Sequence, residues 1–348
     1  MALVFFSHNG LGNVVPGGLG VTIFFVLSGF LITTLMRGEF AETGTVSFRA
    51  FYLRRFLRLI PPLLVVTCIS VAAFFIAGLG DRFTAGGLAS VLLYFSNYFQ
   101  IFHGASGQPP GLGVTWSLAV EEHYYLLYPP LAVALLRFGR PTVSAALLAL
   151  MCALILGWRC WLMSHGGSPE YLGIATDTRV DAILIGCVLA MLRNPWIEPQ
   201  PPRRGADLAL AGVCIALLVA TLLWRSEFFR FTGRYTLQSA AIAGLLYLAV
   251  ARGKMWPWRW LNTAPLVYLG TVSYTIYLAH YLMIDWTLAW LPSWNRVAVA
   301  IVAAALTLVI AELMRRFVEK PCAVLRRRLH HGFVAPVLAP RPAADGHA

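Results

Sequence analysis

Long apolar stretches alternate with short polar ones along almost the whole chain, and this pattern predicts membrane-spanning helices. A helix needs roughly 20 apolar residues to cross a hydrocarbon core of ~30 Å. Because lipid offers no hydrogen-bonding partner to an exposed backbone, each crossing stretch is expected to be helical. We expect spans near residues 19–36, 60–79, 115–136, 143–163, 178–193, 207–225, 236–251, 264–290 and 296–316.

The fold class predicted from this pattern is all-α, a polytopic transmembrane helix bundle with about ten spans. A weaker apolar segment at 87–103 is expected to enter the membrane without crossing it. Residues 1–330 are expected to form one membrane domain. Residues 331–348 are rich in Ala and Pro, which predicts a disordered tail.

Composition supports the membrane interpretation and excludes two other classes. Of 348 residues, 59% are hydrophobic and only 12% are charged, so little of the chain can form a soluble domain. The net charge of +12 does not indicate a nucleic-acid partner, because the basic residues lie in short loops between apolar stretches. The six cysteines are scattered and form no CxxC pair, so neither a metal site nor a disulfide framework is expected.

The distribution of basic residues predicts the orientation of the bundle. If 87–103 does not cross, one set of loops holds 20 of the 27 Lys and Arg residues, and the other set holds five. Basic loops stay in the cytoplasm, which places that set and the C-terminus there. A full crossing by 87–103 would reverse the bias in the later loops, so we favour a re-entrant segment.

His8 is the first ionisable residue next to an apolar stretch, MALVFFS. Charged or titratable groups at membrane depth cost at least ~2.5–3.5 kcal/mol, so they need a partner, water or a function. One interpretation is a histidine at the membrane interface. The other is a general base, since a neutral imidazole can take a proton from an alcohol that attacks a thioester.

The run WSLAVEEHYYLLYPPL at 116–131 contains a second group of polar residues. An interfacial aromatic belt explains Trp116, but it does not explain the adjacent carboxylates Glu121 and Glu122. The predicted topology puts His8 and Glu121 on the same side of the membrane. A carboxylate–imidazole pair, which would hold the imidazole tautomer, is therefore allowed.

An arginine cluster marks the entry to the second span, in FYLRRFLRLIPPLL at 51–64. Arg54, Arg55 and Arg58 are explained either by anchoring at the cytoplasmic face or by a phosphate clamp. Guanidinium groups bind phosphates through two parallel hydrogen bonds. A coenzyme A thioester arriving from the cytoplasm would bring a diphosphate and a 3′-phosphate to such a clamp.

Two later spans also carry polar residues, and each has two explanations. Arg179 and Asp181 lie where the span at 178–193 begins, either as a structural ion pair or in a catalytic role. Ser273, Tyr277 and His280 share one helix face, at spacings of four and three. They serve either hydrogen bonding between helices or function.

Taken in order along the chain, seven of these stretches resemble the membrane-bound acyltransferase-3 family of bacterial O-acyltransferases. The resemblance implies a polytopic inner-membrane enzyme that takes acyl groups, often acetyl, from cytoplasmic acyl-CoA. The acceptors of the family are surface polysaccharides, peptidoglycan, exported oligosaccharides or macrolide-type products. The matching stretches are LVFFSHNG at 3–10, GLGVTIFFVLSGFLITTLM at 18–36, FYLRRFLRLIPPLL, WSLAVEEHYYLLYPPL, TRVDAILIGCVLAML at 178–192, GTVSYTIYLAH at 270–280 and FVEKPCAVLRRRL at 317–329.

The resemblance also implies roles for individual residues. His8 corresponds to the essential histidine of the family, and Glu121 to its acidic residue after Trp-Ser-Leu. The arginine cluster corresponds to its basic motif. Two positions depart from the family pattern: Thr22 stands where an acidic residue is usual, and the arginine that precedes the histidine would fall four residues upstream of Met1. The first span is therefore expected to be shortened.

The function expected from these observations is O-acyl transfer, in the plasma membrane, from acyl-CoA to a carbohydrate or macrolide-like hydroxyl. Acyl-CoA is a co-substrate, and no tightly bound cofactor or metal is expected. His8 would be the base and Glu121 its support, with Ser28 as carrier if an acyl-enzyme forms. The alternatives are a transporter or flippase for a lipid-linked or exported sugar, with buried carboxylates as proton relays, and an inactive shortened homologue.

Overall fold

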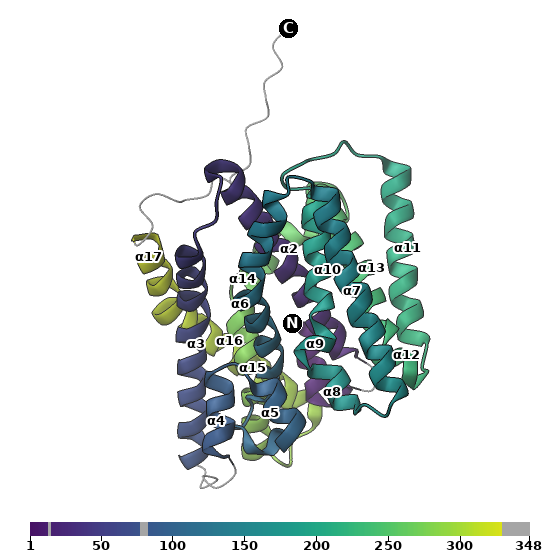
Figure 1. Ribbon diagram of the computed structural model, residues 1–348. Helices are drawn as coiled ribbons and strands as arrows, with labels where there is room; N and C mark the ends of the chain where they lie inside the picture. The colour runs from purple at the N-terminus through teal and green to yellow at the C-terminus, as the bar shows by residue number, and fades with distance from the viewer. Residues whose placement is uncertain (13–14, 77–82, 329–348) are drawn as a thin grey trace.

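The computed structural model describes residues 1–12, 15–76 and 83–328, and throughout these ranges the regular structure is helical. This confirms the all-α prediction, whereas the predicted tail at 331–348 lies outside the described residues. Figure 1 shows the long helices side by side in one bundle. They are α2 (Gly17–Thr43), α3 (Phe48–Ile76), α6 (Trp116–Arg137), α7 (Pro141–Ser164), α10 (Asp181–Leu192), α11 (Arg204–Leu223), α13 (Gly233–Ala251), α15 (Ser273–Trp290) and α16 (Arg296–Met314).

Short helices fill the ends of the bundle and the connections. Their starts follow ordinary capping rules: the Ser168 hydroxyl accepts from the backbone N–H of Tyr171, and Pro169 occupies the first position of the helix. The short elements are α1 (Ala2–Phe6), η1 (Ser7–Leu11), α4 (Ala85–Leu92), α5 (Ser96–His103), α8 (Pro169–Ile174), α9 (Thr176–Arg179), α12 (Glu227–Phe231), α14 (Ala264–Thr271) and α17 (Lys320–Arg328).

The number of membrane spans is only partly settled by helix length and composition. Two predicted spans are interrupted, because 178–193 forms α9 and α10 with a break at Val180, and 264–290 forms α14 and α15 with a break at Val272. The total of about ten therefore stays a prediction. Within the described ranges, five segments are long and apolar enough to cross: Gly17–Thr43, Phe48–Ile76, Pro141–Ser164, Arg204–Leu223 and Arg296–Arg326.

The segment at 87–103 folds as the two short helices α4 and α5. Each has eight residues, or about 12 Å of helix, which is too short to cross a membrane. In Figure 1, α3 ends and α6 begins at the lower end of the bundle, where α4 and α5 also lie. The chain between α3 and α6 thus returns to the end from which it came, in agreement with a segment that does not cross.

The predicted basic loops meet at one end of the bundle, the upper end in Figure 1. We call it the basic end; it comprises residues 37–48, 137–141, 193–204 and 252–264. Ion pairs join its loops: Arg37 lies 2.7 Å from Glu198, and Arg252 lies 2.8 Å from Asp207. The opposite end carries α4, α5, α8 and α12.

The N-terminal segment packs on the start of α2, and this packing sets the position of His8. Gly20 makes the close approach possible, because a Cβ added there would lie 2.7 Å from Cγ2 of Val4. The Asn9 side-chain amide then donates to the backbone oxygen of Arg296, at 3.3 Å. The histidine is thereby placed where α2, α15 and α16 come together, on the side of the opposite end.

Candidate active site

Helix α15 lines two cavities, one above the other along its axis. Tyr274 and Tyr277, in its first half, line a central cavity between α1, α2 and α6. The second half of α15 lines a larger groove at the opposite end, together with α3 and the 105–113 loop. His280 lies on the same helix between these two sets of residues. We call the two spaces the central cavity and the end groove.

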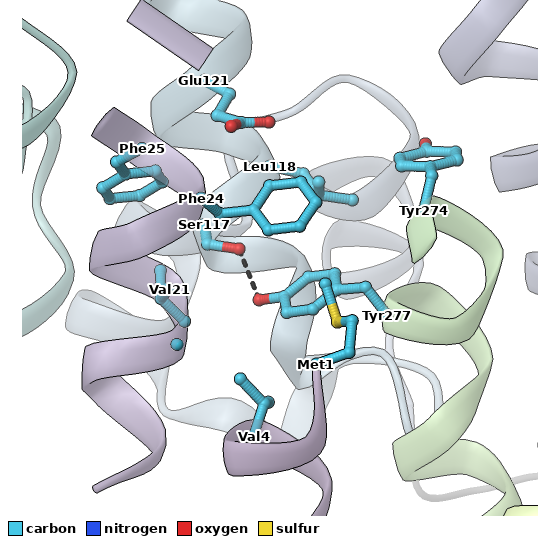
Figure 2. Close-up of a pocket in the computed structure, with 11 residues that line it drawn as sticks. Met1, Val4, Val21, Phe24, Phe25, Ser117, Leu118, Glu121, Tyr274 and Tyr277 are labelled. Carbon is cyan, nitrogen blue, oxygen red and sulfur yellow. Dashed lines mark hydrogen bonds between the residues drawn. The ribbon is translucent and has the colours of Figure 1, made fainter. Parts of the chain in front are cut away.

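The central cavity is narrow, with a free volume of about 10 Å³, which is about enough for one water molecule. Figure 2 shows Met1 and Val4 below it, Phe24 and Phe25 on the α2 side, and Glu121 above. Glu121 is buried, and one of its carboxylate oxygens has no hydrogen-bonding partner in the described structure. A buried acceptor without a partner is costly, so this oxygen is available to a donor group on a ligand.

Two hydroxyl groups lie across the central cavity from each other and form a hydrogen bond, Ser117 from α6 and Tyr277 from α15 (Figure 2). The Tyr277 hydroxyl also donates to the backbone oxygen of Val114, at 2.8 Å. This contact confirms the predicted common level of Ser117 and Tyr277 in the bundle. It fixes α15 against α6 one helical turn away from His280.

His8 and His280 form a direct hydrogen bond, with 2.9 Å between Nδ1 of His8 and Nε2 of His280. Nδ1 of His280 lies 2.6 Å from the backbone oxygen of Tyr277, which can only accept. With both rings neutral, the hydrogen-bond network allows one assignment. His280 donates from Nδ1 and accepts at Nε2, His8 donates from Nδ1, and Nε2 of His8 keeps its lone pair.

The partner of His8 differs from the one allowed by the sequence. The predicted pair with Glu121 is replaced by the pair with His280, because the Ser117–Tyr277 contact lies between Glu121 and the histidines. His8 is exposed, whereas His280 is almost fully buried. The exposed ring is thus free to meet a substrate, and the buried ring holds it.

The predicted arginine cluster lies on the first half of α3, and its members have different surroundings. Arg54 pairs with Glu39 at 3.2 Å. Arg55 lies over the ring of Tyr125, 4.9 Å from its centre, and Arg58 is exposed. The Tyr125 hydroxyl forms a hydrogen bond with Ser28. These side chains lie between the basic end and Glu121, one helical turn along α6.

The predicted pairing of Arg179 with Asp181 is wrong in one respect, since Asp181 pairs with Arg159. Both guanidinium terminal nitrogens of Arg159 donate to the carboxylate, at 3.1 and 2.7 Å, and Thr236 donates to it at 2.7 Å. All of Asp181's acceptors are occupied by the protein, which favours the structural role. Arg179 is buried against Tyr235 and makes a long contact, 3.3 Å, with Thr22.

The other candidates lie around this line without joining it. Trp116 packs edge-on against Phe25, with ring centres 6.3 Å apart. Ser273 is the first residue of α15, and Glu122 is half-buried beside Glu121. Neither Ser273 nor Glu122 lines the central cavity.

Two residues of the site were missed from the sequence, Tyr281 and Asp285. The Tyr281 ring lies 4.8 Å from the His8 ring, between centres, and both residues line the end groove. The signal was present, because Asp285 is a carboxylate within an apolar stretch, like Glu121. The stretch at 264–290 was interpreted from its histidine alone.

Comparisons with known proteins agree with this picture. The model of a family described as "Acyltransferase domain" matches residues 1–316. Peptidoglycan O-acetyltransferase OatA of Listeria monocytogenes is 33% identical over 321 residues, which cover 88% of this chain and 51% of the relative. O-acetyltransferase OatA of Staphylococcus aureus is 28% identical over 319 residues, covering 88% and 52%. No solved structure matches the chain. The chain spans about half the length of these curated relatives.

Proposed function

Because the chain belongs to the acyltransferase-3 family, we propose that it is an integral membrane O-acyltransferase. It takes an acyl group from cytoplasmic acyl-CoA and places it on a carbohydrate hydroxyl at the other side of the membrane. The names of the relatives favour acetyl as the group and peptidoglycan as the acceptor. The basic end then faces the cytoplasm, together with the C-terminus.

The observation that carries the proposal is the position of the His8–His280 pair between two cavities. The central cavity leads toward the arginine cluster, and the end groove opens at the other end. An acyl transfer across a membrane needs a base at the point where donor and acceptor meet. His8 lies at that junction with Nε2 free, whereas its other ring nitrogen is held.

The chemical step follows from this arrangement. Nε2 of His8 takes the proton of the acceptor hydroxyl as its oxygen attacks the thioester carbonyl. The C–O bond forms, the C–S bond breaks, and the coenzyme A thiolate leaves with the proton that His8 had taken. No covalent acyl-enzyme is needed. The Ser28 hydroxyl lies beside Tyr125 rather than beside a base, which favours direct transfer.

The donor would approach from the basic end. Arg55 and Arg58 supply guanidinium groups for the phosphates, whereas Arg54 is partly occupied by Glu39. The pantetheine arm contains two amide N–H groups, and the free carboxylate oxygen of Glu121 can accept from one of them. The central cavity must widen for the arm, by rotation of the flexible Met1 and Phe24 side chains at its wall.

The test is the fate of the thioester in proteoliposomes supplied with radiolabelled acetyl-CoA and a soluble oligosaccharide. We expect free thiol and labelled ester to appear in equal amounts. We expect His8→Ala to lower the rate by about 10²–10⁴-fold, the usual contribution of a general base. His165→Ala, which removes an exposed histidine elsewhere, is the matched control. Sugar transport with an intact thioester would instead establish a transporter.

A further inference from the structure

We propose that the end groove is the acceptor site, and that it binds a glycan strand of N-acetylhexosamines along the second half of α15. The inference rests on the proposed function, since it names the substrate class that reaches His8. The groove is defined by four side chains of α15, Tyr281, Asp285, Trp286 and Trp290, facing the 105–113 loop and the end of α3.

The size of the groove fits a polymer better than a single sugar. Its volume is about 960 Å³, near the top of the ~300–1,000 Å³ that ligand pockets usually have. It is also open along one side, so a strand can enter without threading through. Successive rings could then pass His8 while the remainder of the strand stays outside.

The side chains of the groove match the chemistry of a sugar ring. Trp286 and Trp290 are four residues apart on one row of α15, and Tyr281 and Asp285 are four apart on the neighbouring row. Indole faces stack on the apolar C–H faces of sugars. A carboxylate accepts from ring hydroxyls and from acetamido N–H groups. Trp290 is 76% exposed, so its face is uncovered for such a contact.

The wall across from α15 is rigid. Ser70 donates to the backbone oxygen of Pro110, at 2.7 Å, and the buried Gln108 side chain accepts from Gln100 and donates to Ser90. Gly111 lies so close to α15 that an added Cβ would be 2.4 Å from Cα of Leu282. The groove is therefore held open by packing and hydrogen bonds in the absence of ligand, as expected of a preformed binding site.

The groove also reaches the base. Tyr281 contacts His8 through their rings and lines the groove, and Asp285 is one helical turn further, about 6 Å along α15. A sugar ring stacked on Trp286 and bonded to Asp285 would thus present its neighbouring hydroxyls toward His8. Anchoring of the two tryptophans in the membrane interface, or a lipid chain in the groove, predicts no affinity for sugars.

The experiment measures acceptor binding without the donor. The full chain in lipid nanodiscs is titrated by calorimetry with tetra-N-acetylchitotetraose. We expect saturable binding, weakened about tenfold or more by Trp290→Ala and by Asp285→Asn, as for aromatic and charged anchors in other binding sites. Trp290→Phe should retain more affinity than Trp290→Ala. Trp260→Ala is the matched control, since Trp260 is 61% exposed at the basic end.

Two outcomes would overturn the groove as acceptor site. One is unchanged affinity in both Trp290→Ala and Asp285→Asn. The other is no binding of the oligosaccharide by a wild-type protein that still transfers acetyl groups, which leaves the proposed function standing. The failure of the proposed function would appear differently, as oligosaccharide binding without any consumption of acetyl-CoA. Thermal unfolding of each variant shows whether lost binding reflects lost folding.

Discussion

The hydrogen bond between His8 and His280 decides which nitrogen of His8 is available for chemistry. His280 receives the Nδ1 proton of His8 because its own Nδ1 proton is committed to the backbone oxygen of Tyr277. A chain of this kind orients the base and keeps it in one tautomer. His280 is therefore a positioning residue, which does not itself touch the substrates.

Replacing His280 tests this role. We expect His280→Ala to lower kcat about 10–100-fold with little change in the KM for acetyl-CoA, because only the orientation of the base is lost. His280→Gln should recover part of the rate, since its side-chain oxygen can accept the same proton. Steady-state rates against acetyl-CoA concentration provide the measurement. Equal rates for the Ala and Gln variants would argue against the relay.

The surroundings of Arg179 predict a stabilising substitution. Arg159 and Arg179 are both buried, and Asp181 is bonded to Arg159, so Arg179 has only Thr22 and aromatic faces around it. Thr22→Asp would give this guanidinium a carboxylate partner. We expect the melting temperature to rise by about 2–4 °C for each kcal/mol gained. Thr22→Asn has nearly the same shape without the charge, and an equal rise in both variants would contradict the explanation.

At the scale of single residues, the sequence identified the unusual groups better than their contacts. Polar residues in apolar stretches marked His8, Glu121 and His280, because burial of such groups is costly wherever they lie. Their partners could not be predicted, since His8 and His280 are 272 positions apart in the chain. Asp285 obeys the same rule and was missed, although its apolar neighbourhood is evident in the sequence.

At the scale of helices, the closest contact is the crossing of α2 and α10. A Cβ added to Gly29 would lie 1.9 Å from the backbone oxygen of Ile183, and one added to Gly186 would lie 2.1 Å from that of Val26. Small residues let membrane helices approach in this way, and the gain is dispersion energy and packing density. The crossing supports α2, whose start carries the His8 segment.

Alanine at this crossing should therefore be harmful. We expect Gly186→Ala to destabilise the protein by about 1–3 kcal/mol, since backbone atoms cannot move aside as a flexible side chain can. Gly212→Ala, in α11, is the control, because nothing lies within 4 Å of its added Cβ and helix propensity then favours alanine. Thermal unfolding in detergent compares the two variants. Equal melting temperatures would show that the helices can separate without cost.

The existence of the helices was predictable, but their interruptions were not. Hydropathy marks apolar stretches, so it treated 178–193 and 264–290 as continuous spans. The breaks at Val180 and Val272 contain no glycine or proline that would have announced them. They arise from packing with other helices, which is tertiary information. The second break matters most, because it separates α14 from the helix that lines both cavities.

At the scale of the whole molecule, charge separates the two ends of the bundle. The basic end carries the arginine cluster, and the opposite end carries the groove, with the histidine pair between them. The loop charges predicted this polarity from the sequence, because the positive-inside rule acts on loops and not on contacts. The widths of the cavities were beyond prediction, since they depend on side chains from helices far apart in the chain.

This polarity predicts a kinetic separation of the two substrates. We expect Arg58→Ala to raise the KM for acetyl-CoA about tenfold and to leave the KM for the glycan unchanged, because phosphate contacts at the basic end affect only the donor. Arg140→Ala, which removes an exposed arginine of another loop at the same end, should change neither. A higher KM for the glycan in Arg58→Ala would place the cluster on the acceptor's side instead.

The most direct test of the account is acetyl transfer across a sealed membrane. Proteoliposomes of one orientation receive radiolabelled acetyl-CoA at the basic end and tetra-N-acetylchitotetraose at the opposite end, and the labelled oligosaccharide is counted with time. The account predicts label on the oligosaccharide for the wild type and almost none for His8→Ala, although that variant is folded and inserted. Transfer by His8→Ala at the wild-type rate would contradict it.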